Sequence, residues 1–206
     1  MSVDKLSINT ILLAAGLSSR MGGINKLLID IDGEALVRKV AKLYQTISTS
    51  VTIVLGHDAD RVDEELSDLD VTTVINPDYE KGRQSSARYG LEQLDINGDA
   101  VLIGLADQHM LSKSDLMAFV AAYQNGSHSE ILIPQYAGER GNPILFPAVI
   151  AKQMQADKKA PGCRKYIDEN PDMVRWYKAQ SKHFIEDLDT PEDAERYGIP
   201  LAPKVK

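Results

Sequence analysis

Cysteine and long apolar runs are scarce in this 206-residue chain. Its one cysteine, Cys163, has no partner for an internal disulfide, which suits a reducing compartment. The longest apolar run near the start is Ile11–Ala15, far short of the ~20 residues that cross a bilayer. The opening segment MSVDKLSINT also lacks the basic start and apolar stretch of a secretion signal. We therefore expect a soluble, cytoplasmic protein with no membrane partner.

Positive charge is also in short supply, because 23 Lys and Arg face 30 Asp and Glu and the net charge is -7. A chain this acidic is poorly suited to wrap nucleic acid, whose affinity for proteins depends on many Lys and Arg contacts to phosphate. The hydrophobic share of 43% and the charged share of 26% are typical of globular proteins and exclude a disordered or collagen-like chain. The length suits a single domain, residues 1–206.

Short apolar runs alternate with segments of helical periodicity along most of the chain. The expected strands are Ile8–Ala14, Val51–Leu55, Val71–Ile75, Ala100–Leu105, Glu130–Pro134, Ile144–Phe146, Val174–Ala179 and Phe184–Asp187. The expected helices are Glu34–Ile47, Ala59–Leu66, Ser85–Leu94, Ser112–Tyr123, Ala148–Ala156, Cys163–Asn170 and Thr190–Tyr197. This alternation predicts an α/β fold, a Rossmann-like three-layer α/β/α domain with a mainly parallel sheet. A composition shift near Gln135–Pro147 indicates a small β-containing C-terminal lobe.

The loop after the first strand combines glycine with positive charge, at a strand end where such sheets bind ligands. In LLAAGLSSRMGGINKLL (12–28), Gly16 allows close backbone approach, Ser18 offers a hydroxyl, and Arg20 and Lys26 supply charge. Successive backbone N–H groups in such a loop can cradle an anion. The spacing matches neither the P-loop nor the dinucleotide fingerprint. The residues alone therefore leave two interpretations open, a phosphate-binding loop or an ordinary glycine-rich loop with solvated charges.

The same segment resembles the signature of the molybdenum cofactor cytidylyltransferases and the wider MobA-like NTP transferase family, which open with Leu-Ala-Ala-Gly, then Arg-Met-Gly and a Lys. Four later segments are similar to further motifs of that family, in the same order. They are KGRQSSARYGL (81–91), LIGLADQHML (102–111), RGNPILF (140–146) and DLDTPEDAERYG (187–198). Two positions depart from the family pattern, because His109 stands where proline is usual and Asn142 where histidine is common.

The resemblance implies the fold of the nucleotide-diphospho-sugar transferases, with a nucleotide-binding part at 8–110 and an acceptor-binding part at 111–198. It implies an enzyme that moves CMP from CTP to the terminal phosphate of the molybdopterin cofactor, releases pyrophosphate and uses Mg²⁺ or Mn²⁺. The partner would be a molybdoenzyme of the xanthine dehydrogenase type. Ala15 points to CTP, because the family branch with Ala-Gly-Gly goes with GTP.

The resemblance also assigns roles to single residues. Arg20, Lys26 and Asp107 are the expected catalytic residues, and Asp107 and Asp189 the expected metal ligands, with Asp187 as a substitute. The expected nucleotide-binding residues are Leu13, Ala14, Ala15, Gly16, Ser18, Arg20, Lys26, Ser85 and Ser86. The expected acceptor-binding residues are Arg140, Gly141, Asn142 and Arg164.

Residue chemistry supports some of these roles and leaves alternatives for others. Mg²⁺ prefers oxygen ligands and usually takes one or two carboxylates plus substrate phosphates, and both aspartates follow expected strands. Each aspartate also suits a helix cap or a turn. Ser85 and Ser86 suit helix capping as well as ligand contact, and Arg164 suits a plain surface position.

Two other functions stay open. One is a different NMP transfer within the same fold, either guanylyl transfer to molybdopterin or transfer to a sugar phosphate or alcohol phosphate. The other is a non-catalytic accessory protein that binds a cofactor. Arg20, Lys26, Asp107 and Asp189 together favour the enzyme, because a carrier does not need a metal-bound grip on a triphosphate.

Overall fold

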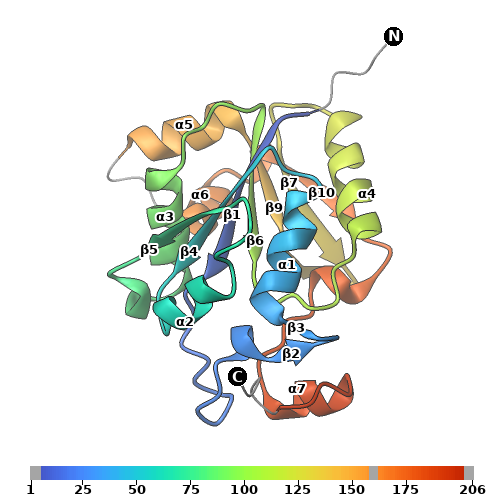
Figure 1. The fold of residues 1–206 in the computed structure, drawn as a ribbon. Helices are drawn as coiled ribbons and strands as arrows, with labels where there is room; N and C mark the ends of the chain where they lie inside the picture. Colours follow the sequence, from blue (N-terminus) through green and yellow to red (C-terminus); the bar gives the residue numbers. More distant parts are fainter. Residues whose placement is uncertain (1–5, 158–161, 202–206) are drawn as a thin grey trace.

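The computed structural model describes residues 6–157 and 162–201, and an eight-stranded sheet forms the centre of the described part (Figure 1). The strand order is β10-β7-β9-β6-β1-β4-β5, with β8 attached to β7. The strands are β1 (Ile8–Ala14), β4 (Ser50–Leu55), β5 (Thr72–Ile75), β6 (Ala100–Leu105), β7 (Ile131–Tyr136), β8 (Glu139–Arg140), β9 (Ile144–Pro147) and β10 (Val174–Lys178). A separate antiparallel pair joins β2 (Asp30–Ile31) to β3 (Glu34–Ala35).

Helices cover both faces of this sheet. They are α1 (Leu36–Gln45), α2 (Ala59–Glu64), α3 (Arg83–Gln93), α4 (Lys113–Gln124), α5 (Ala148–Ala156), α6 (Cys163–Glu169) and α7 (Pro191–Arg196). Because side chains alternate along a strand, Leu12 of β1 packs in the core with α1, α2 and α4, whereas Ile11 packs with α3, α5 and α6. These two sets of helices lie on opposite sides of the sheet in Figure 1. The expected three-layer α/β/α fold is confirmed.

Most strand pairs in the sheet are parallel. The parallel pairs are β1 with β4 and β6, β4 with β5, and β7 with β10. In contrast, β9 runs antiparallel to both β6 and β7. The strands expected for a C-terminal lobe therefore extend the main sheet. The division into a nucleotide-binding part and an acceptor-binding part stays a prediction.

Several expected elements differ from the observed ones at their ends, and one expected strand is absent. The strand expected at Phe184–Asp187 is wrong, because Lys182–Phe184 form a short 3₁₀ turn, η4, and a loop follows. The carbonyl of buried Phe184 accepts hydrogen bonds from the side chain of Gln108 and the backbone N–H of Asn142, so it joins two loops instead of a strand ladder. In addition, α1 begins two residues later than expected, because β3 takes the preceding residues.

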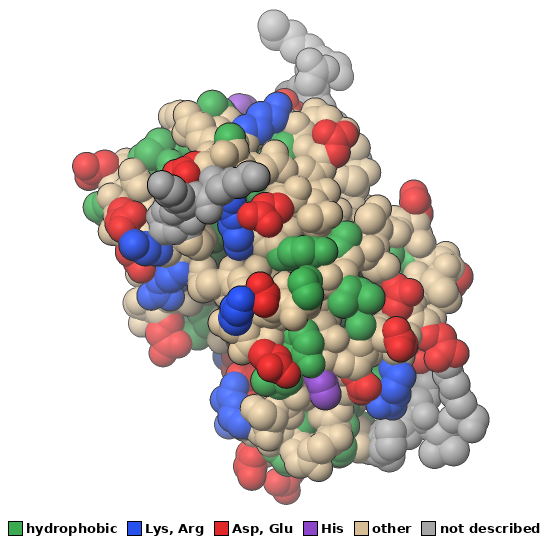
Figure 2. All heavy atoms as spheres, turned by 90° about the vertical axis from the view of Figure 1, so that its left-hand side faces the viewer, with side chains coloured by type: hydrophobic (Ala, Val, Ile, Leu, Met, Phe, Trp, Pro, Cys, Tyr) green, Lys and Arg blue, Asp and Glu red, His purple; other side chains and the backbone are tan. Residues whose placement is uncertain are grey.

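Figure 2 shows the face of the molecule on the side of α3, α5 and β5. Hydrophobic side chains gather near its middle, with acidic and basic side chains around them. Ile75, on the edge strand β5, is 55% exposed. No helix within residues 6–157 and 162–201 combines the length and the apolar character needed to cross a membrane.

Candidate active site

The loop after β1 leads to the 3₁₀ turn η1 (Lys26–Leu28). Gly22 and Gly23 have φ of 64° and 91°, values that glycine adopts without a steric penalty. Ser18 also has a positive φ, and its Oγ accepts a hydrogen bond from the backbone N–H of Lys26 at 3.2 Å. The serine therefore ties the loop to the start of the turn that presents Lys26.

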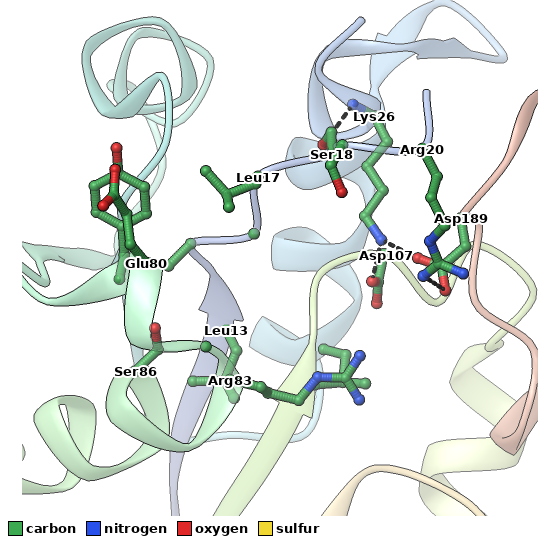
Figure 3. A pocket seen from close by; sticks show the side chains of 16 residues that line it. Leu13, Leu17, Ser18, Arg20, Lys26, Glu80, Arg83, Ser86, Asp107 and Asp189 are labelled. Carbon is green, nitrogen blue, oxygen red and sulfur yellow. Dashed lines mark hydrogen bonds and ion pairs between the residues drawn. The ribbon is translucent and has the colours of Figure 1, made fainter. Parts of the chain in front are cut away.

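Lys26 is the cation at the centre of the site (Figure 3). Its side chain is 10% exposed, and Nζ donates to Asp107 Oδ2 at 2.5 Å and to Asp189 Oδ1 at 2.7 Å. Burial alone would lower the pKa of Lys26, but the charges and hydrogen bonds of the two carboxylates outweigh it and raise the pKa. Arg20, which is 65% exposed, reaches the other oxygen of Asp189 at 2.7 Å. The lysine therefore stays charged at neutral pH.

Backbone and side-chain hydrogen bonds bring Asp107 and Asp189 together across a long stretch of sequence. The backbone N–H of Leu188 donates to the carbonyl of Asp107 at 3.0 Å. The fully buried Gln108 donates to the carbonyl of Phe184, also at 3.0 Å. The two aspartates meet as the sequence predicts, although Asp189 follows a loop and not a strand.

Asp187 adds a third carboxylate to this edge of the sheet. Its side chain is 21% exposed, and Arg83 lies 3.9 Å away. Burial, followed by the negative charge of Asp107, raises the pKa of Asp187 to about 7, while Arg83 and Lys26 act in the opposite direction. The carboxyl group of Asp187 therefore takes up a proton close to neutral pH.

Arg20, Lys26, Asp107 and Asp189 line a cavity of about 280 Å³ (Figure 3), whereas Asp187 lines a neighbouring cavity. Most of the predicted nucleotide-binding residues face it, namely Leu13, Ala15, Gly16, Ser18, Arg20, Lys26 and Ser86, together with Asp107 and Asp189. Ala14 does not line the cavity, because its side chain packs in the core beside α1. Ser85 does not line it either. Contact between the other residues and a nucleotide stays a prediction.

Ser85 and Ser86 lie inside α3, so the helix-capping interpretation of these serines is wrong. The residue before the helix is Gly82, and no side chain caps it. Ser85 Oγ donates to the carbonyls of Asp78 and Gly82 at 2.8 and 2.9 Å. Buried Asn76 donates to both serine hydroxyls at 3.1 Å. Asn76 thus anchors the start of α3, a role that the sequence motifs do not reveal.

The segment that runs from the end of β5 into the first turn of α3 contributes cavity residues that the sequence prediction missed. They are Tyr79, Glu80, Gly82 and Arg83. The available signal was the polar run NPDYEKGR directly after an apolar strand, because loops at the carboxyl ends of parallel strands form ligand sites. Arg83 points into the cavity from the first turn of α3 (Figure 3).

A second cavity, of about 230 Å³, adjoins the first and shares Leu13, Arg83 and Leu105 with it. The predicted acceptor-binding residues Arg140, Gly141, Asn142 and Arg164 all line this second cavity. Cys163 lines it as well, but burial raises the pKa of its thiol to about 11. The thiol is therefore protonated at neutral pH, consistent with a packing role. Acceptor contact by the four predicted residues stays a prediction.

The donor set fits a divalent metal ion. Asp107 Oδ1 is buried and has no hydrogen-bond partner within the described residues. The described ranges contain no group of three or more His, Cys, Asp or Glu arranged for metal binding. However, Mg²⁺ usually takes only one or two carboxylates and completes its shell with phosphate oxygens and water. Asp107 and Asp189 satisfy that smaller requirement, and metal ligation by them stays a prediction.

His109 follows Asp107 closely but belongs to a different environment. Its ring packs edge to face on Tyr197, with ring centroids 4.4 Å apart. Burial is the largest influence on its pKa, which is lowered. The histidine is therefore predominantly neutral at neutral pH and packs beside the site.

Residues 10–174 match the family model of the MobA-like NTP transferase domain. Over 203 residues the chain is 26% identical to a nicotine blue oxidoreductase from Paenarthrobacter nicotinovorans, an alignment that covers 94% of this chain and 97% of the relative. It is 32% identical over 120 residues to the bifunctional protein GlmU from Cupriavidus pinatubonensis, but covers only 26% of that protein. The family match confirms the resemblance drawn from the motifs.

Solved structures share the fold over nearly the whole chain. A nucleotidyl transferase from Methanothermobacter superposes with a TM-score of 0.75 at 20% identity, covering 93% of this chain and 95% of the other. The Mycobacterium tuberculosis protein Rv0371c gives 0.77 at 21% identity, covering 93% and 96%. A structure of Rv0371c in complex with manganese gives 0.71 at 19% identity, covering 92% and 97%. At these identities the likeness establishes the fold alone.

Proposed function

The chain belongs to the MobA-like NTP transferase domain family, and from that premise we propose that it transfers CMP from CTP to the terminal phosphate of a molybdopterin-type cofactor. In this reaction an acceptor phosphate oxygen bonds to the α-phosphorus of CTP, and the bond from that phosphorus to the departing pyrophosphate breaks. Such a reaction needs two substrates side by side and positive charge where phosphates lie. The two joined cavities, with Lys26 between Asp107 and Asp189 at the first one, carry the proposal.

The chain's own residues supply positioning and charge. Lys26 acts as a buried point charge toward the triphosphate, and Arg20 at the more exposed edge offers a guanidinium that can bind phosphate oxygens in a bidentate manner. Ala15 and Gly16 provide backbone close to the base and ribose. The space beside the α-carbon of Gly16 is open, because a Cβ built there would meet no atom within 4 Å. A nucleotide can therefore lie close to the backbone at this position.

Asp107 and Asp189 would hold Mg²⁺ or Mn²⁺ in this enzyme. When bound, the ion would neutralise charge on the triphosphate and the departing pyrophosphate. The buried, unpartnered Oδ1 of Asp107 supports this assignment.

The choice of CTP depends on Ala15. This alanine is 6% exposed and its methyl group lies on the side of Gly56 and Tyr79. Ala15 also lines the cavity, and under this proposal its methyl group narrows the wall against a larger purine base. Under this proposal the product would be delivered to a molybdoenzyme of the xanthine dehydrogenase type in the cytoplasm.

The decisive experiment measures pyrophosphate release with each of the four NTPs, Mg²⁺ or Mn²⁺, and one acceptor at a time. The acceptors are molybdenum-loaded molybdopterin, sugar phosphates and alcohol phosphates. We expect release with CTP and the molybdenum-loaded cofactor, loss of release in Lys26→Met, and unchanged release in the surface control Lys39→Met, whose lysine pairs with Asp32.

Other outcomes would replace the proposal in distinct ways. Release with GTP would indicate guanylyl transfer, and release only with a sugar phosphate or alcohol phosphate would change the acceptor class. Cofactor binding without any release would indicate an accessory protein.

Because one relative is named an oxidoreductase, a parallel assay follows reduction of nicotine blue with NADH or NADPH as the added reductant. Turnover there without pyrophosphate release would overturn nucleotidyl transfer.

A further inference from the structure

The second cavity has an apolar wall, a single arginine on the side of the first cavity and a pair of arginines elsewhere in its lining. Arg83 lines both cavities, whereas Arg140 and Arg164 line the second one alone. The apolar lining comes from Ala87, Ile103, Leu105, Ile144 and Phe146. A ligand of this cavity therefore meets guanidinium groups in two places and an apolar surface as well.

Arg140 and Arg164 carry more positive charge than their surroundings neutralise. Both lie near the same carboxylate, Asp168, with guanidinium-to-carboxylate distances of 3.5 and 3.2 Å. Asp168 is 56% exposed, so water screens its charge, while Arg140 is only 18% exposed. Burial, followed by the charge of Arg164, lowers the pKa of Arg140. An anion placed between these two side chains would relieve that repulsion.

Anion binding at this place would use the guanidinium groups and not the end of α6. The backbone N–H of Arg164 already donates to Gln84 Oε1 at 3.1 Å. The side chain of Arg164 is 62% exposed and is therefore available to a ligand.

Arg83 occupies the place where the two cavities meet. Its side chain is 52% exposed, and its ion-pair distance to Asp187 is a long 3.9 Å, so its donors are not saturated. A group held by Arg83 would lie next to the nucleotide cavity. In nucleotidyl transfer that group is the attacking phosphate of the acceptor.

We propose that the acceptor is a phosphate monoester that carries a second anionic group on an apolar body. Its phosphate lies at Arg83, its body lies on the apolar wall, and its second anion lies between Arg140 and Arg164. This inference rests on the proposed function, narrows the acceptor class and adds Arg83 as a substrate contact.

The test compares two probes, phenyl phosphate and 4-carboxyphenyl phosphate, by calorimetric titration of the full-length protein without nucleotide. We expect the carboxylated probe to bind at least about tenfold tighter, since it gains a charge-assisted hydrogen bond. Arg164→Gln, at an exposed site that tolerates substitution, should reduce this preference to below about threefold. Arg83→Gln should weaken both probes alike and leave the preference intact.

Arg140→Lys and Arg61→Gln complete the design. Arg140→Lys keeps the charge of a partly buried side chain but loses the bidentate geometry, so the preference should fall while the fold survives. Arg61, which pairs with Asp58 and lines neither cavity, serves as the matched control and should change neither affinity. Equal binding of the two probes, no binding of either, or a preference that survives Arg164→Gln and Arg140→Lys would overturn the inference. Because no nucleotide is present, failure of the proposed CMP transfer would not alter these affinities.

Discussion

Lys26→Met removes the central charge of the site while keeping an unbranched side chain that is one atom shorter. Its energetic effect falls mainly on Asp107, because Asp189 retains Arg20 at 2.7 Å. Asp107 already has one unpartnered buried oxygen among the described residues and would lose its 2.5 Å contact as well. Removing one partner of a buried ion pair costs about 3–5 kcal/mol. Because the two side chains retain 10% and 12% exposure, we expect the lower end, about 3 kcal/mol.

The assay is urea denaturation of the wild type, Lys26→Met, Asp107→Asn and the double variant at neutral pH. The double variant should recover about 2 kcal/mol relative to the sum of the single effects, because it leaves no uncompensated charge. Since domains of this kind have about 5–15 kcal/mol of stability, Lys26→Met should remain folded. Its kcat should fall by about a hundredfold or more, because a preorganised charge at the phosphates is missing.

Additive costs in the double variant would refute the reasoning, since they would show that Lys26 and Asp107 do not stabilise one another. Full turnover in Lys26→Met would refute the catalytic role separately. Lys39→Met is the control, because this lysine lies at the surface and should change stability by less than about 0.5 kcal/mol.

Three further predictions concern the core, pH dependence and base selection. Gly104→Ala should destabilise the fold by about 1–3 kcal/mol in thermal unfolding, because the new Cβ overlaps the hydroxyl of Tyr44, a fully buried side chain that cannot move aside; an unchanged melting temperature would contradict this. Burial acts to raise the pKa of Asp115, but hydrogen bonds from Ser112 and His183 outweigh it and lower the pKa below 3.8. The resulting stabilisation is present above 3.8 and is lost as the pH falls through the lowered folded-state pKa, so Asp115→Asn should cost about 1 kcal/mol near pH 7 and less near pH 3 in denaturant titrations. An equal loss at both pH values would argue against the assignment. Ala15→Gly should lower the ratio of kcat/KM for CTP to that for GTP by about tenfold, and an unchanged ratio would remove Ala15 from base selection.

Local sequence patterns predicted several elements well, for identifiable reasons. The sequence predicts β1 and β6 with the bounds they have, because β6 is a continuous apolar run and β1 is mostly apolar, as expected for strands that are almost entirely buried. The capping boxes at Ser112 and Thr190 mark the starts of α4 and α7, and such caps depend only on residues three positions apart.

The errors lie where distant contacts override local pattern. The residue types at Phe184–Asp187 predict a strand. However, the carbonyl of Phe184 accepts hydrogen bonds from Gln108 and Asn142 and not from a neighbouring strand. The sequence predicts that Ser85 caps α3. However, α3 begins two residues earlier, and Asn76 donates hydrogen bonds to the hydroxyls of Ser85 and Ser86. These hydrogen bonds join segments whose proximity no local periodicity encodes.

The sequence by itself determined the class of fold and the family, because these depend on local periodicity and on motifs in a fixed order. Only the tertiary structure decided that Lys26 lies between Asp107 and Asp189, because that meeting depends on the backbone hydrogen bond from Leu188 to Asp107. The tertiary structure also decided that Arg83 lines both cavities, since their shared wall is assembled from β1, α3 and β6. Charges that are far apart in sequence become one site only when the loops after β1 and β6 and the loop before α7 meet at one edge of the sheet.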